Sequence, residues 1–308
     1  MEFKHIPVLL KECIEGLNIK ENGIYVDGTL GGAGHSIEIL KKLKTGLLIG
    51  IDRDKQALKA AQEKLSKFKN IEYVYGNHDD IKEILESKNI NGVDGILLDL
   101  GVSSYQLDEA TRGFSYMKDS ELDMRMDLSS ELTARKVVNT YSEEKLAEIF
   151  LKYGEERFSK KIAKKICEVR KKKEIETTQE LVKIIEEIVP KTNKKDGHPA
   201  KRVFQAIRIE VNDELNPLYN TIKNCIDVLN SKGRLCVITF HSLEDRIVKK
   251  AYTDAIGKCI CPSDLPYCVC GRKKLGTIVN KKPIIATKEE MNENTRSKSA
   301  KLRIFEKI

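Results

Sequence analysis

The chain has 308 residues, of which 40% are hydrophobic and 33% charged, and its formal net charge is +8 at pH 7. It is about twice as long as a typical domain of roughly 100–150 residues, which excludes a disulfide-stapled miniprotein and favours one large domain or a domain with an insertion. The longest apolar runs, such as Gly46–Ile51 and Leu235–Phe240, are much shorter than the roughly 20 residues that cross a bilayer. We therefore expect no signal peptide and no membrane span.

The positive charge is concentrated in two segments. Residues 152–202 contain 16 Lys and Arg against 9 Asp and Glu, and residues 271–308 contain 11 against 4. By contrast, residues 1–151 contain 20 against 26. A localised basic surface attracts phosphate groups, whereas dispersed lysines only keep a surface solvated. The two segments are therefore candidate contacts to a polyanion, and the alternative is that they form solvated helix faces.

The first hundred residues alternate short apolar runs with amphipathic stretches, which is the pattern of βα units that form a parallel sheet. The predicted strands are Ile24–Asp27, Leu47–Asp52, Ile71–Tyr75 and Val93–Leu100. The helical patterns between them cover Gly34–Leu43, Lys55–Phe68 and Asp79–Lys88. This part of the sequence predicts an α/β fold.

After the fourth predicted strand the alternation stops. The sequence from about Asp108 to Asn212 is rich in helix formers and has no convincing strand pattern. A strand pattern returns at Gly233–Phe240, a helical pattern covers Ser242–Ala255, and Lys301–Phe305 is a candidate last strand. We predict one discontinuous α/β domain, residues 1–107 and 213–308, interrupted by a helical insert, residues 108–212.

A glycine-rich turn follows the first predicted strand, where Asp27 is followed by four glycines before Ser36. Glycine lets the backbone approach a ligand closely, and a helix N-terminus favours a carboxylate or phosphate. The next strand ends in Asp52, whose carboxylate suits the hydroxyls of a ribose. The pair fits NAD or S-adenosylmethionine, and Asp27 favours the latter because a carboxylate repels a pyrophosphate but tolerates a sulfonium. Asp99 ends the fourth strand on the same predicted edge, where it is either a ligand contact or a turn cap.

Four of the eight cysteines lie in two Cys-x-Cys pairs, Cys259 with Cys261 and Cys268 with Cys270. Such crowding does not form a spread disulfide framework and fits a reducing cytoplasm. Two pairs of this kind can share a tetrahedral zinc ion, and they can also be reduced thiols in a turn. The sequence leaves both interpretations open. The remaining cysteines are predicted core thiols: Cys13, Cys167, Cys225 and Cys236.

Seven segments in order along almost the whole chain resemble the RsmH or MraW family, the ribosomal RNA small subunit methyltransferases H. The segments are His5–Glu12, Asp27–Ser36, Leu98–Ser104, Leu122–Asp127, Tyr153–Phe158, Phe204–Ile209 and Phe240–Arg246. The resemblance implies a class I methyltransferase sheet with a helical insert that recognises the substrate. It also implies transfer of a methyl group from S-adenosylmethionine to N4 of a cytidine in the decoding region of 16S rRNA.

The resemblance further implies a set of cofactor-binding positions and no metal in the catalytic site. The positions are Ala33, Gly34, His35, Asp52, His78, Asp99 and Gln106. One position departs from the family pattern: His78 stands where relatives carry an aromatic residue near the adenine, and an imidazole can stack in a similar way.

The implied chemistry needs substrate-side residues as well, because the N4 amine of cytosine is a poor nucleophile whose lone pair is delocalised into the ring. A catalyst has to accept hydrogen bonds from the amine, align it and accept a proton. The candidates are Asp99, His241, Asp123, Ser242 and Arg125. His241 begins a predicted helix and has a purely structural alternative, and Asp123 with Arg125 has the alternative of an internal ion pair.

The expected partner is 16S rRNA within the small ribosomal subunit. The lysines and arginines expected to grip its phosphates are Lys160, Lys161, Lys164, Lys165, Arg170–Lys173, Lys201, Arg202, Arg296, Lys298, Lys301 and Arg303. Two alternatives remain open: a methyltransferase acting on amino groups of DNA, and a non-catalytic RNA-binding ribosome assembly factor. The sequence does not distinguish a monomer from a homodimer.

Overall fold

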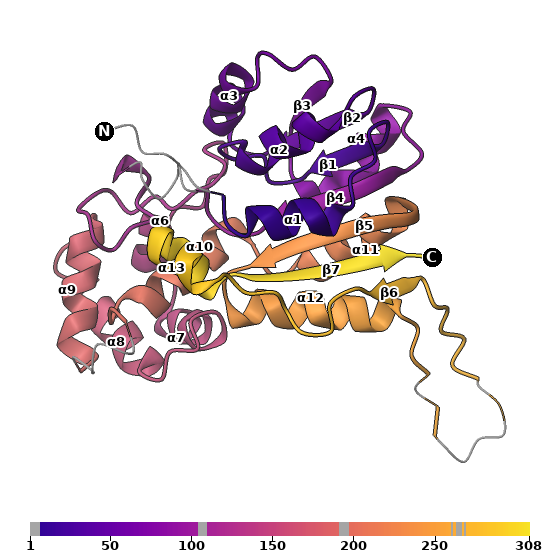
Figure 1. The fold of residues 1–308 in the computed structure, drawn as a ribbon. Helices are drawn as coiled ribbons and strands as arrows, with labels where there is room; N and C mark the ends of the chain where they lie inside the picture. Colours follow the sequence, from indigo (N-terminus) through magenta and orange to yellow (C-terminus); the bar gives the residue numbers. More distant parts are fainter. Residues whose placement is uncertain (1–6, 104–109, 191–196, 260, 263–266, 268) are drawn as a thin grey trace. The chain divides into compact units, whose positions relative to one another are not determined.

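The computed structural model describes residues 7–103, 110–190, 197–259, 261–262, 267 and 269–308. The chain divides into two compact units (Figure 1). The first comprises Met1–Gly101 with Leu215–Ile308, and the second is Val102–Glu214. The first unit contains a mixed sheet covered by helices, and the second is helical.

Seven strands form one sheet in the first unit, in the spatial order β3-β2-β1-β4-β5-β7-β6. Strands β3, β2, β1, β4 and β5 pair in parallel, whereas β7 pairs antiparallel with both β5 and β6. A mostly parallel sheet covered by helices is the architecture expected from the sequence, so the predicted α/β fold class is confirmed. The strands are β1 (Ile24–Asp27), β2 (Leu47–Asp52), β3 (Ile71–Tyr75), β4 (Val93–Asp99), β5 (Leu229–Thr239), β6 (Gly276–Ile278) and β7 (Lys301–Lys307).

The central strands are apolar on both faces because helices cover the sheet on each side. Leu97 and Leu98 are consecutive on β4, and both are fully buried. Helices α1 and α2 contribute to a core cluster with Leu97, Cys236 and Ile304. In a second group, α11 packs against both α4 and α12. The helices of this unit are α1 (Leu10–Leu17), α2 (Gly34–Lys42), α3 (Lys55–Lys64), α4 (Ile81–Ser87), α11 (Leu218–Val228), α12 (Ser242–Ala255) and α13 (Lys288–Glu293).

The regular secondary structure described in the second unit is helical, apart from an isolated bridge between Glu121 and Thr177, and residues 113–133 contain no helix. Thr133, Ser142 and Thr177 cap three of its helices, because each side chain accepts a hydrogen bond from a first-turn amide. The helices are α6 (Ala134–Thr140), α7 (Glu143–Lys152), α8 (Ser159–Arg170), α9 (Thr178–Ile188) and α10 (Lys201–Asn212). Among the described residues of both units, no helix has the length and apolar character that a membrane span requires.

The element bounds agree closely with the sequence pattern in the first hundred residues. The first three predicted strands coincide with β1, β2 and β3, and β4 ends one residue early at Asp99. Strand β5 begins at Leu229, four residues before its predicted start, and β7 continues to Lys307. The short strand β6 and helix α13 were not predicted.

Candidate active site

Three neighbouring strands end in a carboxylate at one edge of the sheet. Asp27, Asp52 and Asp99 are the last residues of β1, β2 and β4, and β1 lies between the other two strands. The register pairs Asp99 with Ile238, so β5 also reaches this edge just before His241. Carboxyl edges of open parallel sheets are where α/β proteins bind ligands.

Asp27 stabilises the glycine-rich loop from inside. Its carboxylate accepts a hydrogen bond from the Ser36 hydroxyl at 2.7 Å and one from the Thr29 amide at 3.1 Å. The side chain is buried, and this burial raises the pKa of Asp27 above its ordinary value. Both carboxylate oxygens are therefore used to fix the two ends of the loop.

The loop is also tied to the strands on either side. Gly28 donates its amide to Leu97 on β4 at 2.9 Å, and Leu30 donates to Ile51 on β2 at 3.0 Å. The loop ends at Ala33, which has a left-handed φ of 57° and precedes α2. Among the described residues no side chain caps α2, so its first-turn amides are suited to an anionic ligand group.

His78 follows β3 and touches the start of the loop. A Cβ at Gly28 would lie 3.1 Å from Cβ of His78 and 2.5 Å from Cδ2 of Leu98, so a larger residue would displace the Leu98 side chain and crowd His78. Burial lowers the pKa of His78 to about 4, although nearby Asp79 opposes the shift. The imidazole is therefore neutral at pH 7, which suits an uncharged contact to an aromatic base.

Asp52 accepts two backbone hydrogen bonds, from Gly31 and from Asp54, both at 2.8 Å. Burial raises the pKa of Asp52 to about 6, and these two hydrogen bonds partly oppose the increase. Each carboxylate oxygen retains a second lone pair. Asp52 can thus hold the loop and still accept hydrogen bonds from the hydroxyls of a ligand.

Asp99 differs from the other two carboxylates because one of its oxygens has no hydrogen-bond partner in the described structure. Oδ1 is buried and has no hydrogen-bond partner among the described residues, while Oδ2 lies 3.9 Å from Nδ1 of His35. His35 donates from Nε2 to the carbonyl of Val8 at 3.0 Å, which leaves Nδ1 facing Asp99. Burial raises the pKa of Asp99 to about 6; His35 partly opposes this increase, whereas nearby Asp27 adds to it. A buried acceptor without a donor is costly, and a ligand N–H or O–H group would satisfy it.

The whole chain aligns with a known family. Residues 2–308 match the model of the MraW methylase family. The chain belongs to this family. Among its relatives, ribosomal RNA small subunit methyltransferase H of Clostridium botulinum strain Loch Maree is 58% identical over the full length of both chains. The protein of the same name from Lachnospira eligens is 56% identical, over 100% of this chain and 99% of that one.

One solved structure to which this chain is similar is that of SMU.1697c, a putative methyltransferase from Streptococcus mutans in complex with SAH. It is 13% identical, the match covers 99% of this chain and 100% of that one, and the TM-score is 0.45.

In this MraW-family chain, His241 caps helix α12. Its Nδ1 accepts from the Glu244 amide at 3.4 Å, and Glu244 in return accepts from the amides of Phe240 and His241, which is a reciprocal capping box. Nε2 lies 3.1 Å from Oε1 of the buried Glu244, in a contact that lacks hydrogen-bond alignment. The capping box supports the structural alternative for His241. Because its buried Nε2 has no hydrogen-bond partner among the described residues, a role in moving protons stays a prediction.

We expect His241→Ala to lower the free energy of unfolding by about 1 kcal/mol, the usual effect of losing an N-cap. His241→Asn should keep most of that stability and most of the methyl-transfer rate, because Asn is a preferred N-cap. Chemical denaturation and initial-rate assays on both variants check this. An Asn variant with wild-type stability and no activity would return His241 to the catalytic group.

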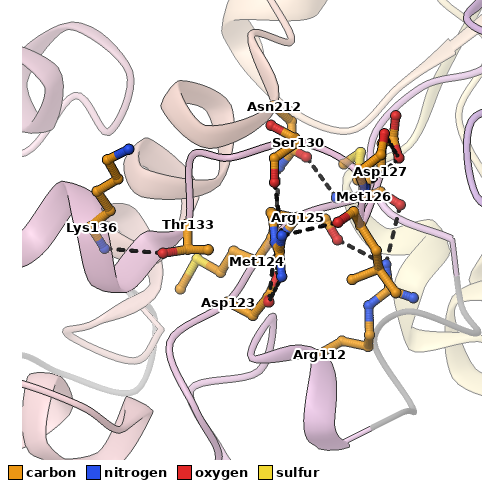
Figure 2. A network of polar contacts seen from close by, with 12 residues as sticks. Arg112, Asp123, Met124, Arg125, Met126, Asp127, Ser130, Thr133, Lys136 and Asn212 are labelled. Carbon is orange, nitrogen blue, oxygen red and sulfur yellow. Dashed lines mark hydrogen bonds and ion pairs between the residues drawn. The ribbon is translucent and has the colours of Figure 1, made fainter.

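Asp123 and Arg125 form an ion pair in the second unit (Figure 2). Nη2 of Arg125 lies 2.7 Å from Oδ2 of Asp123, and Nη1 of Arg125 donates to the carbonyls of Leu128 and Ser130 at 3.0 and 2.7 Å. The guanidinium therefore braces the segment that follows it. Any substrate contact by Asp123 would have to compete with this pairing.

Two polar residues outside the predicted site complete the same network (Figure 2). Arg112 is buried and donates to the carbonyls of Arg125 and Met126 at 2.8 and 3.2 Å. Asn212, at the end of α10, accepts from the Met126 amide and donates to the Met124 carbonyl. No sequence pattern marks Arg112 or Asn212, because both act through backbone groups that are distant in sequence.

The predicted basic residues separate into exposed and internal members. Lys160, Lys161 and Lys164 are exposed on α8. Arg303 was wrongly assigned to an RNA surface, because it is buried and its Nε lies 2.6 Å from Oδ1 of Asp245. Arg170 likewise donates to the carbonyls of Val138 and Tyr141 within its own unit.

A hollow of about 270 Å³ lies beside the end of β5. Phe240, His241 and Ser242 form one wall, and Ile285 and residues 298–301 contribute to the rest. Lys298 and Lys301 line it, so its rim is basic.

The described cofactor positions lie at the start of one helix and at the ends of three strands. Ala33, Gly34 and His35 lie at the start of α2, and Asp52, His78 and Asp99 follow or end β2, β3 and β4. Gln106 lies outside the described residues.

Proposed function

We propose that this chain methylates N4 of a cytidine in the decoding region of 16S rRNA, in the small ribosomal subunit and in the cytoplasm, with S-adenosylmethionine as methyl donor. The observation that carries the proposal is the full-length match, at 58% identity, to a protein named ribosomal RNA small subunit methyltransferase H. The site chemistry described above is consistent with this activity and suggests a role for each residue.

The residues at the carboxyl edge fit the proposed cofactor. S-adenosylmethionine supplies an electrophilic methyl group on a sulfonium. The uncapped N-terminus of α2 suits its carboxylate, Asp52 suits the ribose hydroxyls, and the neutral imidazole of His78 suits the adenine. Oδ1 of Asp99, which has no hydrogen-bond partner among the described residues, provides an acceptor next to the loop, where it can serve either an amino group of the cofactor or the amine of the substrate.

We assign Asp99 to the amine. An N–H···O bond from the exocyclic amine to Oδ1 would polarise that amine, so that its lone pair becomes less delocalised into the ring. The same oxygen can accept the proton that the amine loses. A pKa of about 6 leaves the carboxylate mostly ionised at pH 7 while keeping its proton affinity close to the working pH.

The helical insert, residues 108–212, is proposed to bind the RNA. A target base in folded RNA has to be unstacked before it enters a catalytic site, at a cost of a few kcal/mol that contacts to phosphates can offset. The exposed lysines of α8 and Lys298 beside the hollow are suited to such contacts. Lys301 also lines the hollow, but its Nζ lies 3.5 Å from Oδ2 of Asp245.

Reversing the charges of Lys160, Lys161 and Lys164 to Glu is expected to weaken binding to 16S rRNA by about tenfold or more at moderate salt, and to reduce the salt dependence of binding. Filter-binding titrations at several salt concentrations measure both. Affinity for S-adenosylmethionine should stay unchanged.

A matched control for that variant reverses three exposed lysines of the first unit, Lys59, Lys67 and Lys69. It changes the net charge equally and is expected to affect RNA binding much less. Equal losses in both triple variants would show that only overall charge matters.

Mapping methylated nucleotides in 16S rRNA from cells lacking this protein tests the proposed function. We expect one cytidine in the decoding region to lose its N4 methyl group, and a plasmid copy of the wild-type gene to restore it. An unchanged map would refute the proposal. Purified protein that methylates DNA but not small subunits would indicate the DNA enzyme, and restoration of subunit assembly by an inactive variant would indicate the assembly factor.

A further inference from the structure

One motif plays no part in the proposed methyl transfer: the cysteine pairs in the segment between α12 and β6 (Figure 1). The base of this segment is closed, because Leu275 donates its amide to the Ala255 carbonyl at 2.8 Å. Gly257, at a φ of +64°, lies so close to Lys273 that a Cβ would come within 2.5 Å of the Lys273 carbonyl oxygen. The two arms of the segment therefore begin side by side.

Beyond this base, thiols from both arms come together. The Sγ atoms of Cys259 and Cys261 on the outgoing arm and of Cys270 on the returning arm all lie within 4.8 Å of one another. Sγ of Cys259 and Sγ of Cys270 are 4.0 Å apart. With zinc–sulfur bonds of about 2.3 Å, two thiolates on a tetrahedral zinc ion are about 3.8 Å apart. A disulfide would need about 2.05 Å, so this separation matches a shared metal ion.

Backbone amides point at two of these sulfurs. Cys261 donates its amide to Sγ of Cys259 at 3.4 Å, and Val269 donates to Sγ of Cys261 at 3.3 Å. Hydrogen bonds of this kind orient metal ligands and stabilise the negative charge of a thiolate. They also fix the sulfur positions before any ion arrives.

The apolar side chains that the structure describes around the thiols are exposed. Tyr267 and Val269 are 74% and 66% exposed, so the apolar side chains described there do not form a core. Exposed apolar side chains such as these do not hold a segment in one shape, and structural metal ions serve as cross-links in small modules.

We propose that Cys259, Cys261 and Cys270 bind a structural zinc ion that joins the two arms of the segment. Each thiol loses its proton to solvent on binding, and three thiolates supply three of the four tetrahedral positions. The proposal rests on these three cysteines; Cys268 lies outside the described residues. A soft, thiolate-only donor set favours zinc over magnesium or calcium.

Metal analysis of the full-length protein, expressed with added zinc and purified without chelator, tests the site. We expect about one zinc ion per chain in the wild-type protein. The double variant Cys259→Ser/Cys270→Ser should contain little zinc, whereas Cys167→Ser, a cysteine on α8 in the other unit, should retain it. Wild-type protein with less than about a tenth of an ion per chain would overturn the proposal, as would a double variant that keeps its zinc.

A second measurement does not depend on how the protein was expressed. Adding Co²⁺ to metal-free, reduced protein should produce the intense near-ultraviolet absorption of thiolate–cobalt bonds, which zinc then displaces. The Cys259→Ser/Cys270→Ser protein should not produce it. An intact mass that is lower by two hydrogens, with no bound metal, would show a disulfide instead and contradict the proposal.

Discussion

Asp99→Asn should lower kcat for methyl transfer by about 100-fold or more, within the range that a positioned acid or base contributes. The amide has nearly the shape of the carboxylate, so the loop and β4 should keep their structure. What is lost is the charge on Oδ1 and its capacity to take a proton. Oδ1 is buried and has no hydrogen-bond partner in the part of the chain that the structure describes, which is the structural reason for this expectation.

Initial rates with small ribosomal subunits and calorimetric titration with S-adenosylmethionine separate the two possible roles of Asp99. If it serves the amine, kcat falls and the Kd for the cofactor changes little. A variant that binds the cofactor 100-fold more weakly but reaches wild-type kcat at saturation would assign Asp99 to the cofactor instead. Asp94→Asn is the matched control, because Asp94 lies at the other end of β4 and pairs with Lys20.

The same Asp99→Asn substitution is expected to stabilise the cofactor-free protein at pH 8 by about 3 kcal/mol. Burial raises the pKa of Asp99 from its ordinary value of 3.8 to about 6, and each pKa unit corresponds to about 1.4 kcal/mol. The ionised carboxylate therefore opposes folding above pH 6. An amide at this position avoids that cost and can donate to Nδ1 of His35, which already faces the side chain.

The stability that Asp99→Asn adds should decrease as the pH falls. Between pH 3.8 and about 6 the folded protein binds more protons at Asp99 than the unfolded chain does, so this group's contribution to stability falls as pH rises through that window. The difference between variant and wild type should thus shrink as pH falls from 7 to 4. Urea denaturation across that range measures it. A difference that is constant with pH would show that packing, rather than ionisation, separates the two proteins.

The parallel half of the sheet was predictable because its strands are buried on both faces. Leu47–Asp52 is a nearly continuous apolar run, and its end was placed correctly. The early start of strand β5 was missed because its first part, Leu229–Lys232, is mostly polar and lacks a strand pattern. Only the pairing of Leu229 with Val93 makes this part a strand. Strand β6 has three residues and depends entirely on β7. Such elements follow from tertiary contacts that no local pattern contains.

The positions of the acidic strand ends were also predictable. Once the apolar strands are located, a carboxylate that ends a parallel strand must lie at the carboxyl edge of the sheet. Which of these carboxylates has hydrogen-bond partners for both oxygens was not predictable. Asp27 is satisfied by Ser36 and Thr29, whereas Asp99 keeps an oxygen without a donor among the described residues. Likewise, Arg303 reads as a basic tail residue, but its place on the inner strand β7 buries it against Asp245.

The pairing of β4 with β5 also bears on how the protein acquires its structure. Asp99 and Ile238 are neighbours in the sheet but about 140 residues apart in sequence, so joining them as a flexible loop would carry a large closure entropy. If the insert folds first, the chain between the two strands has fewer conformations to lose, and the entropy cost of pairing them is smaller. We expect the helical unit to form early during synthesis and the parallel sheet to be completed afterwards, which makes mutations in the insert candidates for slowing the folding of the distant carboxyl edge.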